Sequence, residues 1–182
     1  VGLAMESSTS DTVIIRDSVI NGYGQSFSFS GGGHFYLNGM TFLSNGKVGQ
    51  ISSSQLSIAN GTWEGESHGL DAQYSSINVL NTNISVGENH GTALRILGGD
   101  LSVNGDLNLT HEAQWADTTS IGLQLIWSHI IANSVNIEGF STGFSCETTS
   151  TTEIASLSII DNTNIGYFQA CSESQIESVT ST

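Results

Sequence analysis

Hydrophobic and polar residues alternate along this chain in a phrase that recurs seven times. Each copy has two apolar residues one position apart, a turn containing Asn or Asp, and a closing apolar residue. The copies run from Val13 to Ile20, Phe35 to Phe42, Leu56 to Trp63, Ile77 to Ile84, Leu101 to Leu109, Ile130 to Ile137 and Leu157 to Ile165. The closing residues are 21 to 28 positions apart. A period in the twenties, with alternation inside each unit, is typical of a stacked β array.

The polar residue of each turn predicts one corner of a coil. These residues are Asp17, Asn38, Asn60, Asn81, Asn104, Asn133 and Asn162. Asn tolerates the left-handed backbone of a tight turn and can bond to nearby backbone groups, so a column of such residues is expected at this corner.

A third strand is predicted after each closing residue. Its copies lie at 26–29, 69–72, 92–96, 121–125, 143–146 and 168–171. Three short strands in each unit predict an all-β, right-handed parallel β-helix of about seven coils, with 21 to 28 residues per coil. A β-sandwich with accidental periodicity is the alternative.

The composition of the chain limits the classes of partner that it could bind. The 182 residues suit one domain, contain no proline, and are only 11% charged. Three basic residues against 17 acidic ones give a net charge of −14, which excludes nucleic-acid binding because phosphates require clustered Lys or Arg. No apolar run approaches 18 residues, so no membrane insertion by this segment is expected. Residues 1–182 are expected to be one β-helix segment of a longer repeat protein, because both ends resemble the middle of a unit.

The repeated coils resemble the pectin-lyase-like parallel β-helix superfamily along nearly the whole chain. That superfamily includes polysaccharide lyases, phage tailspikes and autotransporter passenger domains. The acidity, the absence of proline and the richness in Ser, Thr, Asn and Gly look most like a bacterial autotransporter passenger of the adhesin type. The resemblance implies a secreted or cell-surface virulence protein, with a phage virion as the alternative. It carries over no catalytic motif.

A duplicated turn is the sharpest local feature. Gly-Glu-Ser-His-Gly at 65–69 is followed by Gly-Glu-Asn-His-Gly at 87–91. Stacked in register, Glu66 is expected over Glu88 and His68 over His90, with His111 and Glu112 near the same corner. Three interpretations stay open: simple structural repetition, a glycan or cation contact, and a carboxylate pair for glycoside hydrolysis.

The three tryptophans are predicted to differ. Trp63 stands at a closing apolar position and Trp127 continues the alternation of Leu123 and Leu125, so both are expected in the core. Trp115 lies in a polar stretch within a lengthened unit, where a protruding loop is expected. Loops on rigid scaffolds commonly carry binding residues, so Trp115 is the candidate for a sugar contact.

The spacing of the cysteine and histidine residues does not indicate a bound metal or cofactor. Cys146 and Cys171 lie in neighbouring third strands, where a disulfide and two buried free thiols are equally compatible with the pattern. The five histidines show no zinc-ligand spacing, and the acidic residues show no calcium-loop pattern. No metal or cofactor is therefore predicted.

Two functions from different classes remain. The first is a surface adhesin segment that binds another copy or a glycan through flat rows of Ser, Thr and Asn, such as 52–55, 75–76 and 148–152. The second is a phage tailspike or secreted polysaccharide-degrading enzyme that uses Glu66 and Glu88. A lyase is disfavoured because Arg16, Lys47 and Arg95 are expected to be scattered over the coil. An enzyme is thus the less favoured interpretation.

Overall fold

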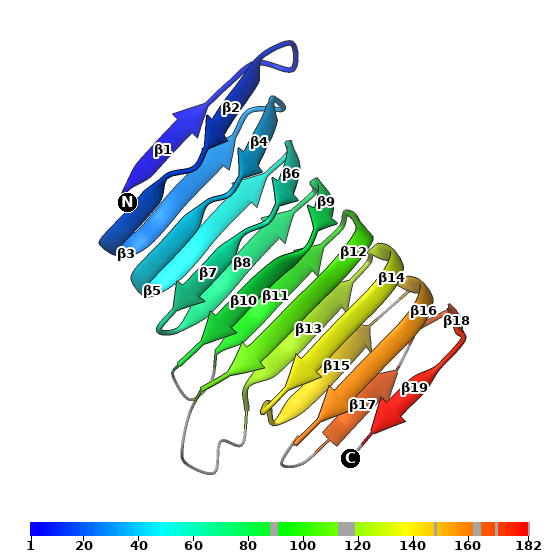
Figure 1. Ribbon diagram of the computed structural model, residues 1–182. Helices are drawn as coiled ribbons and strands as arrows, with labels where there is room; N and C mark the ends of the chain where they lie inside the picture. Colours follow the sequence, from blue (N-terminus) through cyan, green and yellow to red (C-terminus); the bar gives the residue numbers. More distant parts are fainter. Residues whose placement is uncertain (88–90, 113–118, 148, 162–164, 170, 182) are drawn as a thin grey trace.

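The strands stack side by side along one axis. A computed structural model describes residues 1–182 except 88–90, 113–118, 148, 162–164, 170 and 182. The N-terminal strands lie at one end of the stack and the C-terminal strands at the other (Figure 1). Neighbouring strands pair in parallel, one coil above the next, and the chain completes about seven turns. The predicted parallel β-helix is confirmed.

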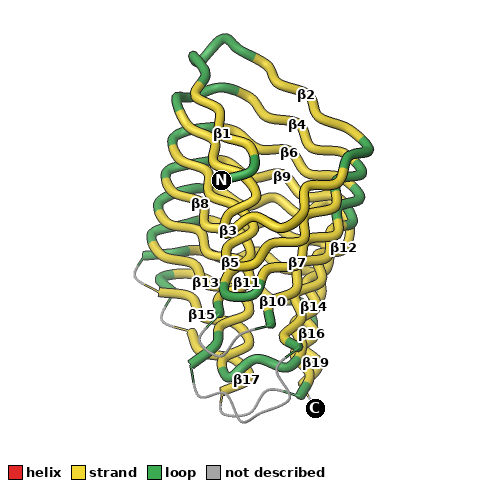
Figure 2. The backbone as a smooth tube through the Cα atoms, turned by 90° about the vertical axis from the view of Figure 1, so that its left-hand side faces the viewer, coloured by secondary structure: helices red, strands yellow, loops and turns green. Residues whose placement is uncertain are grey.

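Each coil contributes strands to three walls. Figure 2 shows the stacked coils, with the strands in yellow and the loops and turns that join them in green. Wall A contains β1 (Leu3–Glu6), the ends of β3 (Val19–Ser30) and β5 (Thr41–Ser52), β8 (His68–Gln73), β11 (Thr92–Leu97), β13 (Ile121–Ile126), β15 (Thr142–Glu147) and β17 (Ile165–Gln169). Wall B contains β2 (Thr12–Arg16), β4 (His34–Asn38), β6 (Gln55–Ala59), β9 (Ser76–Leu80), the starts of β12 (Asp100–His111), β14 (His129–Glu138) and β16 (Thr151–Ile160), and β18 (Glu173–Ile176). Wall C contains the starts of β3 and β5, β7 (Thr62–Gly65), β10 (Thr82–Val86), the ends of β12, β14 and β16, and β19 (Val179–Ser181).

The alternation of the sequence places every second residue inside the coil. The closing apolar residues form one inward column, in which Phe42, Trp63, Ile84 and Leu109 are each at most 1% exposed. In the first coils the core is aromatic: the Phe29 and Phe35 rings stack 4.3 Å apart, and Phe42 meets Trp63 edge-on at 5.2 Å. Later coils fill the core mainly with Leu, Ile and Val, together with Phe140 and Phe144. The core prediction for Trp63 is confirmed.

The seventh unit is shifted from its predicted register. Ile159, not Ile165, pairs with Ile137 and continues the closing column, while Ile165 begins the next strand of wall A. The φ-x-φ spacing of Leu157 and Ile159 fits either position, because both strands alternate with the same period. At the C-terminal end of wall B, Ile176 pairs with Ile154.

The corner between walls B and C uses the predicted Asn and Asp residues in only some coils. Asp17, Asn60 and Asn81 have positive φ values of 48°, 53° and 49°, as expected of residues that tolerate this conformation. In the second coil Gly39 takes this position, with φ of 63°, and Asn38 precedes it. In the fifth and sixth coils β12 and β14 run through the corner, and Asn104 and Asn133 lack positive φ. Asn162 lies outside the described residues.

The corner between walls A and B is more regular, and we call it the serine corner. Its tip is a column of residues with positive φ: Gly31, Ser53, Tyr74, Gly98, Trp127 and Thr149. Behind each tip lies a Gly or Ser, and the serines Ser54, Ser75, Ser128 and Ser150 are buried.

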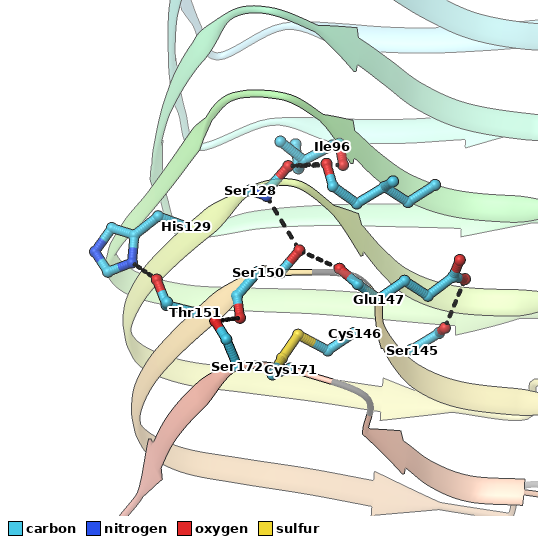
Figure 3. Close-up of a disulfide and its surroundings, with 11 residues drawn as sticks. Ile96, Ser128, His129, Ser145, Cys146, Glu147, Ser150, Thr151, Cys171 and Ser172 are labelled. Carbon is cyan, nitrogen blue, oxygen red and sulfur yellow. Dashed lines mark hydrogen bonds between the residues drawn. A yellow bond between two sulfur atoms is a disulfide. The ribbon is translucent and has the colours of Figure 1, made fainter.

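The buried hydroxyls satisfy the backbone of this turn. Ser128 Oγ donates to the Ile126 carbonyl at 2.7 Å and accepts from the Gly99 N–H at 3.4 Å. The Ser128 N–H donates in turn to Ser150 Oγ at 3.1 Å, as Figure 3 shows. Because a buried backbone group without a partner is costly, the stacked serines stabilise the turn in successive coils.

Two sequence predictions are wrong at the serine corner. Trp127 does not continue into the core: its left-handed backbone reverses the direction of the side chain, which is 57% exposed. Ser54, Ser75 and Ser150 were expected in outward rows, yet each is at most 5% exposed.

The two cysteines lie near the C-terminal end of the stack, in β15 and just after β17. Cys146 and Cys171 form a disulfide with their Cα atoms 5.5 Å apart, beside Ser150 and Ser172 (Figure 3). The open choice between disulfide and free thiols is resolved in favour of the disulfide. It joins wall A of one coil to the turn that follows wall A in the next.

Candidate functional site

A groove with three carboxylates follows the corner between walls C and A, and we call it the acidic groove. It is lined by Asn21, Leu43, Ser44, Asn45, Glu64, Gly65, Glu66, Ser85, Gly87 and Glu112. Glu64, Glu66 and Glu112 are all exposed. No Lys, Arg or His is among these lining residues, so the groove is uniformly negative.

The coil stack fixes the spacing of these carboxylates. The Gly87 N–H donates to the Glu66 carbonyl at 3.2 Å, and the Glu112 N–H donates to the Val86 carbonyl at 3.0 Å. Glu66, Gly87 and Glu112 therefore occupy three successive coils. The backbones of Glu66 and Glu112 are separated by two coil rises, about 9.6 Å. A Cβ at Gly87 would meet nothing within 4 Å, which leaves the space between them open.

The duplicated turn does not stack as a strict 22-residue repeat. His68 pairs with Thr92, 24 positions later, because the chain gains residues between β10 and β11. The expected placement of His68 over position 90 is therefore wrong. Glu88, His90 and Trp115 lie outside the described residues, so their predicted roles stay predictions.

His68 belongs to a different surface, on wall A, which we call the Asp71 cluster. Its lining residues are Lys47, His68, Leu70, Asp71, Thr92, Arg95 and Gln124. Lys47 Nζ and Arg95 Nη1 lie 3.6 and 3.8 Å from Asp71 Oδ2. The Asp71 side chain is only 13% exposed, and the two cations offset the cost of removing its charge from water.

This cluster corrects the expectation of scattered basic residues for Lys47 and Arg95, whereas Arg16 lies apart on wall B. Lys47 and Arg95 are 48 positions apart in sequence, but β5, β8 and β11 are neighbours in wall A. Asp71 Oδ1 is buried without a hydrogen-bond partner, so the cluster retains one unused acceptor. The sequence carries a signal for this site: Gln50, Asp71 and Arg95 share one outward column of the third-strand repeat.

An amide ladder runs along wall C. Asn108 Nδ2 donates to Asn83 Oδ1 at 2.7 Å, and Asn136 Nδ2 donates to Asn108 Oδ1 at 2.8 Å. A side-chain amide has two N–H groups and two acceptor lone pairs. Within the ladder, each Asn donates at most one hydrogen bond and accepts at most one. Each Asn therefore keeps hydrogen-bonding capacity at a repeat of one coil, about 4.8 Å.

Metal and membrane chemistry were also considered. Within the described ranges, no three His, Cys, Asp or Glu side chains are grouped so that they could hold a metal ion. The same part of the chain contains no helix long and apolar enough to cross a membrane.

The fold and these surfaces define a class: a parallel β-helix protein that displays its polar groups on the outer walls and corners of the stack. Comparisons with protein-family models, curated proteins and solved structures give no match. The β-helix and its repeat architecture are shown by the structure itself.

Proposed function

We propose that this chain is a binding segment of a secreted or cell-surface bacterial β-helix protein, of the adhesin type, that attaches to a glycan through its outer walls. The amide ladder of Asn83, Asn108 and Asn136 is the observation that carries this proposal. Its hydrogen bonds hold the side chains in place, so little rotamer entropy remains to be lost on binding. A polymer with regularly repeated hydroxyl groups matches such a row.

Binding to an immobilised panel of bacterial and host glycans tests this function. The wild-type chain is expected to be retained on at least one glycan, and Asn108→Ala is expected to reduce retention. Asn78→Ala is the matched control, because Asn78 is exposed on wall B and lies outside the ladder. Absence of retention on every glycan would contradict the proposal.

Self-association is the second form of adhesion that an outer ladder can support, because two copies can align the same rows. Light scattering over a range of protein concentrations distinguishes it. A concentration-dependent dimer that Asn108→Ala abolishes, without glycan binding, assigns the ladder to a second copy of the chain.

Polysaccharide hydrolysis is the second candidate function, and the acidic groove favours it. The backbones of Glu66 and Glu112 are about 9.6 Å apart, so their flexible side chains can bring the carboxyl groups to the separation of about 6.5–9.5 Å found in inverting glycosidases. Release of reducing ends from polysaccharides by the wild type, lost in Glu66→Gln and in Glu112→Gln, would support it. Glu88→Gln tests the pair predicted from sequence, and Glu153→Gln on wall B is the control. A wild-type chain that releases no reducing ends excludes this candidate.

A further inference from the structure

Two exposed aromatic rings stand at the tip of the serine corner, and neither is explained by the fold. Tyr74 and Trp127 are 60% and 57% exposed, and each has a left-handed backbone with φ near 50°. We propose that Tyr74 and Trp127 form a stacking site for an extended, β-1,4-linked polysaccharide. This inference rests on the proposed function and names the site and the substrate class.

The backbone at these two positions is unfavourable for aromatic residues. A bulky residue with positive φ is uncommon, whereas Gly and Asn adopt this conformation readily. Gly31 and Gly98 occupy the same column in other coils and meet its needs without strain. The corner therefore does not need aromatic residues, and a strained conformation of this kind indicates a functional reason for the side chain.

Gly98 lies between the two rings and leaves room for one of them. A Cβ on Gly98 would lie 2.8 Å from both Cδ1 and Cε1 of Tyr74. The Tyr74 ring thus extends over the Gly98 backbone, along the stack and toward the coil that carries Trp127. A side chain at position 98 would collide with this ring, so the glycine is required for its placement.

The spacing of the two tip positions selects the kind of polysaccharide. Tyr74 and Trp127 are two coils apart, a backbone rise of about 9.6 Å. In an extended β-1,4-linked chain, every second pyranose presents the same face, and the repeat of two sugars closely matches two coil rises. One face of such a pyranose carries axial C–H groups, which pack against the negative face of an aromatic ring. Trp127 and Tyr74 are therefore placed to stack on two sugars of one chain.

Polar groups beside Trp127 suit the hydroxyls of the bound sugar. A groove at this corner is lined by Gly98, Gly99, Asp100, Trp127, Ser128, His129, Thr149 and Thr151. Asp100 and His129 are adjacent in register, and His129 Nδ1 hydrogen-bonds to Thr151 Oγ1 (Figure 3). That bond orients the imidazole while its second nitrogen can still accept or donate a bond.

The chemistry of this groove favours a sugar over a protein partner. Trp127 is the one large hydrophobic side chain among the described residues that line it. Protein interfaces surround their aromatic anchors with a largely apolar core. A single ring bordered by hydroxyl, carboxylate and imidazole groups instead matches the apolar face and polar edge of a pyranose.

Isothermal titration with cellohexaose and chitohexaose tests the site, with α-1,4-linked maltohexaose as a comparison. We choose Trp127→Asn and Tyr74→Asn because Asn retains the left-handed corner, as at Asn60 and Asn81. Each variant is expected to weaken binding of a β-1,4-linked hexasaccharide at least about tenfold. The double variant is expected to abolish measurable binding, and maltohexaose is expected to bind weakly or not at all.

Control variants separate this site from other aromatic surfaces. Tyr36→Thr removes an exposed ring from wall B and is expected to bind as the wild type. Gly98→Ala keeps both aromatic residues but displaces the Tyr74 ring, and is expected to weaken binding. Circular dichroism establishes that each variant has kept the β-helix.

Several outcomes would overturn the inference. Unchanged binding by the double variant, or equal affinity for maltohexaose, removes the stacking site while the proposed glycan-binding function stands. A wild type that is retained on other glycans but binds neither β-1,4-linked probe has the same consequence. Loss of self-association in Trp127→Asn, with no sugar binding, assigns the corner to a protein contact. Absence of binding to every glycan removes the proposed function as well.

Discussion

The two tight corners of the coil reach a similar backbone conformation by different means. The corner between walls B and C depends on the residue with positive φ itself, and its Asn and Asp side chains face solvent. The serine corner places its polar partner behind the turn, in buried hydroxyls that bond to the backbone of the same and neighbouring coils. The first corner becomes continuous strand at Asn104 and Asn133, whereas the second keeps positive φ from Gly31 to Thr149.

This difference explains where side chains are free to vary. In the serine corner the buried hydroxyl stabilises the turn, so the exposed tip accommodates Gly, Ser, Tyr, Trp or Thr. At the other corner the tip residue must supply the conformation, and only Asp, Asn and Gly are found there with positive φ in the first four coils. Variation at an exposed, rigid position is a property that suits a binding surface.

Replacing a buried serine is expected to have the largest effect. Ser128→Val removes the hydroxyl proton that is shared between the Ile126 and Ile96 carbonyls and leaves the Gly99 N–H unpaired. A loss of about 3 kcal/mol in the free energy of unfolding is expected, measured by denaturant titration. Ser102→Val on wall B is the matched control and is expected to change stability by less than about 0.5 kcal/mol. Equal effects from the two variants would contradict the role of the buried hydroxyl.

Removing the disulfide tests how far along the stack this bond stabilises the coils. Cys171→Ala opens a closed loop with a sequence separation of 25, and is expected to cost about 2 kcal/mol. Hydrogen exchange is expected to increase in β16 and β18 while β6 and β9 keep their protection, because the coils of a solenoid contact mainly their neighbours. A uniform increase along the whole chain would show that the bond stabilises more than the last coils.

A smaller effect is expected at the other corner. Asn81→Ala loses the favourable left-handed residue and the bond from the Asp106 N–H to Asn81 Oδ1, at a cost of about 1 kcal/mol. Asn104→Ala is expected to be near neutral, because Asn104 lies in a continuous strand without positive φ. The difference between their denaturation midpoints measures how much stability is gained from an Asn, rather than an Ala, at a position with positive φ. Two equal losses would mean that the conformation contributes little.

The smallest effect is a gain in stability. Trp127→Asn replaces an aromatic residue with one that tolerates positive φ, and is expected to raise the free energy of unfolding by about 0.5 kcal/mol. Thr149→Asn relieves a β-branched residue in the same conformation and is expected to gain at least as much. Thermal denaturation of the two variants measures these gains. Destabilisation by Trp127→Asn would show that the exposed ring contributes to folding.

The walls of the fold could be predicted from sequence, because each wall combines short-range alternation with a long-range repeat. Phe42, Trp63 and Ile84 follow that rule and are buried in one column. Ile165 was misplaced since alternation alone does not distinguish one wall from the next. Trp127 was misplaced because a single left-handed residue reverses the alternation without changing its spacing.

The sites were less predictable, because they depend on which outer residues become neighbours across coils. Lys47 and Arg95 meet at Asp71 only when three strands are placed in register. His68 was assigned to the wrong surface because the repeat length changes between β10 and β11. One signal was present but unused: a Gly or Ser follows each tip residue of the serine corner, as in Tyr74-Ser75 and Trp127-Ser128.

The tip positions of the serine corner also form a linear array with a fixed pitch. Positions 31, 53, 74, 98, 127 and 149 lie one coil apart, about 4.8 Å between neighbours. Any pattern written into these six positions would be displayed in order along a straight edge. If a polymer binds along this corner as proposed, exchanging Gly and aromatic residues at these positions would change the spacing between the rings that stack on it.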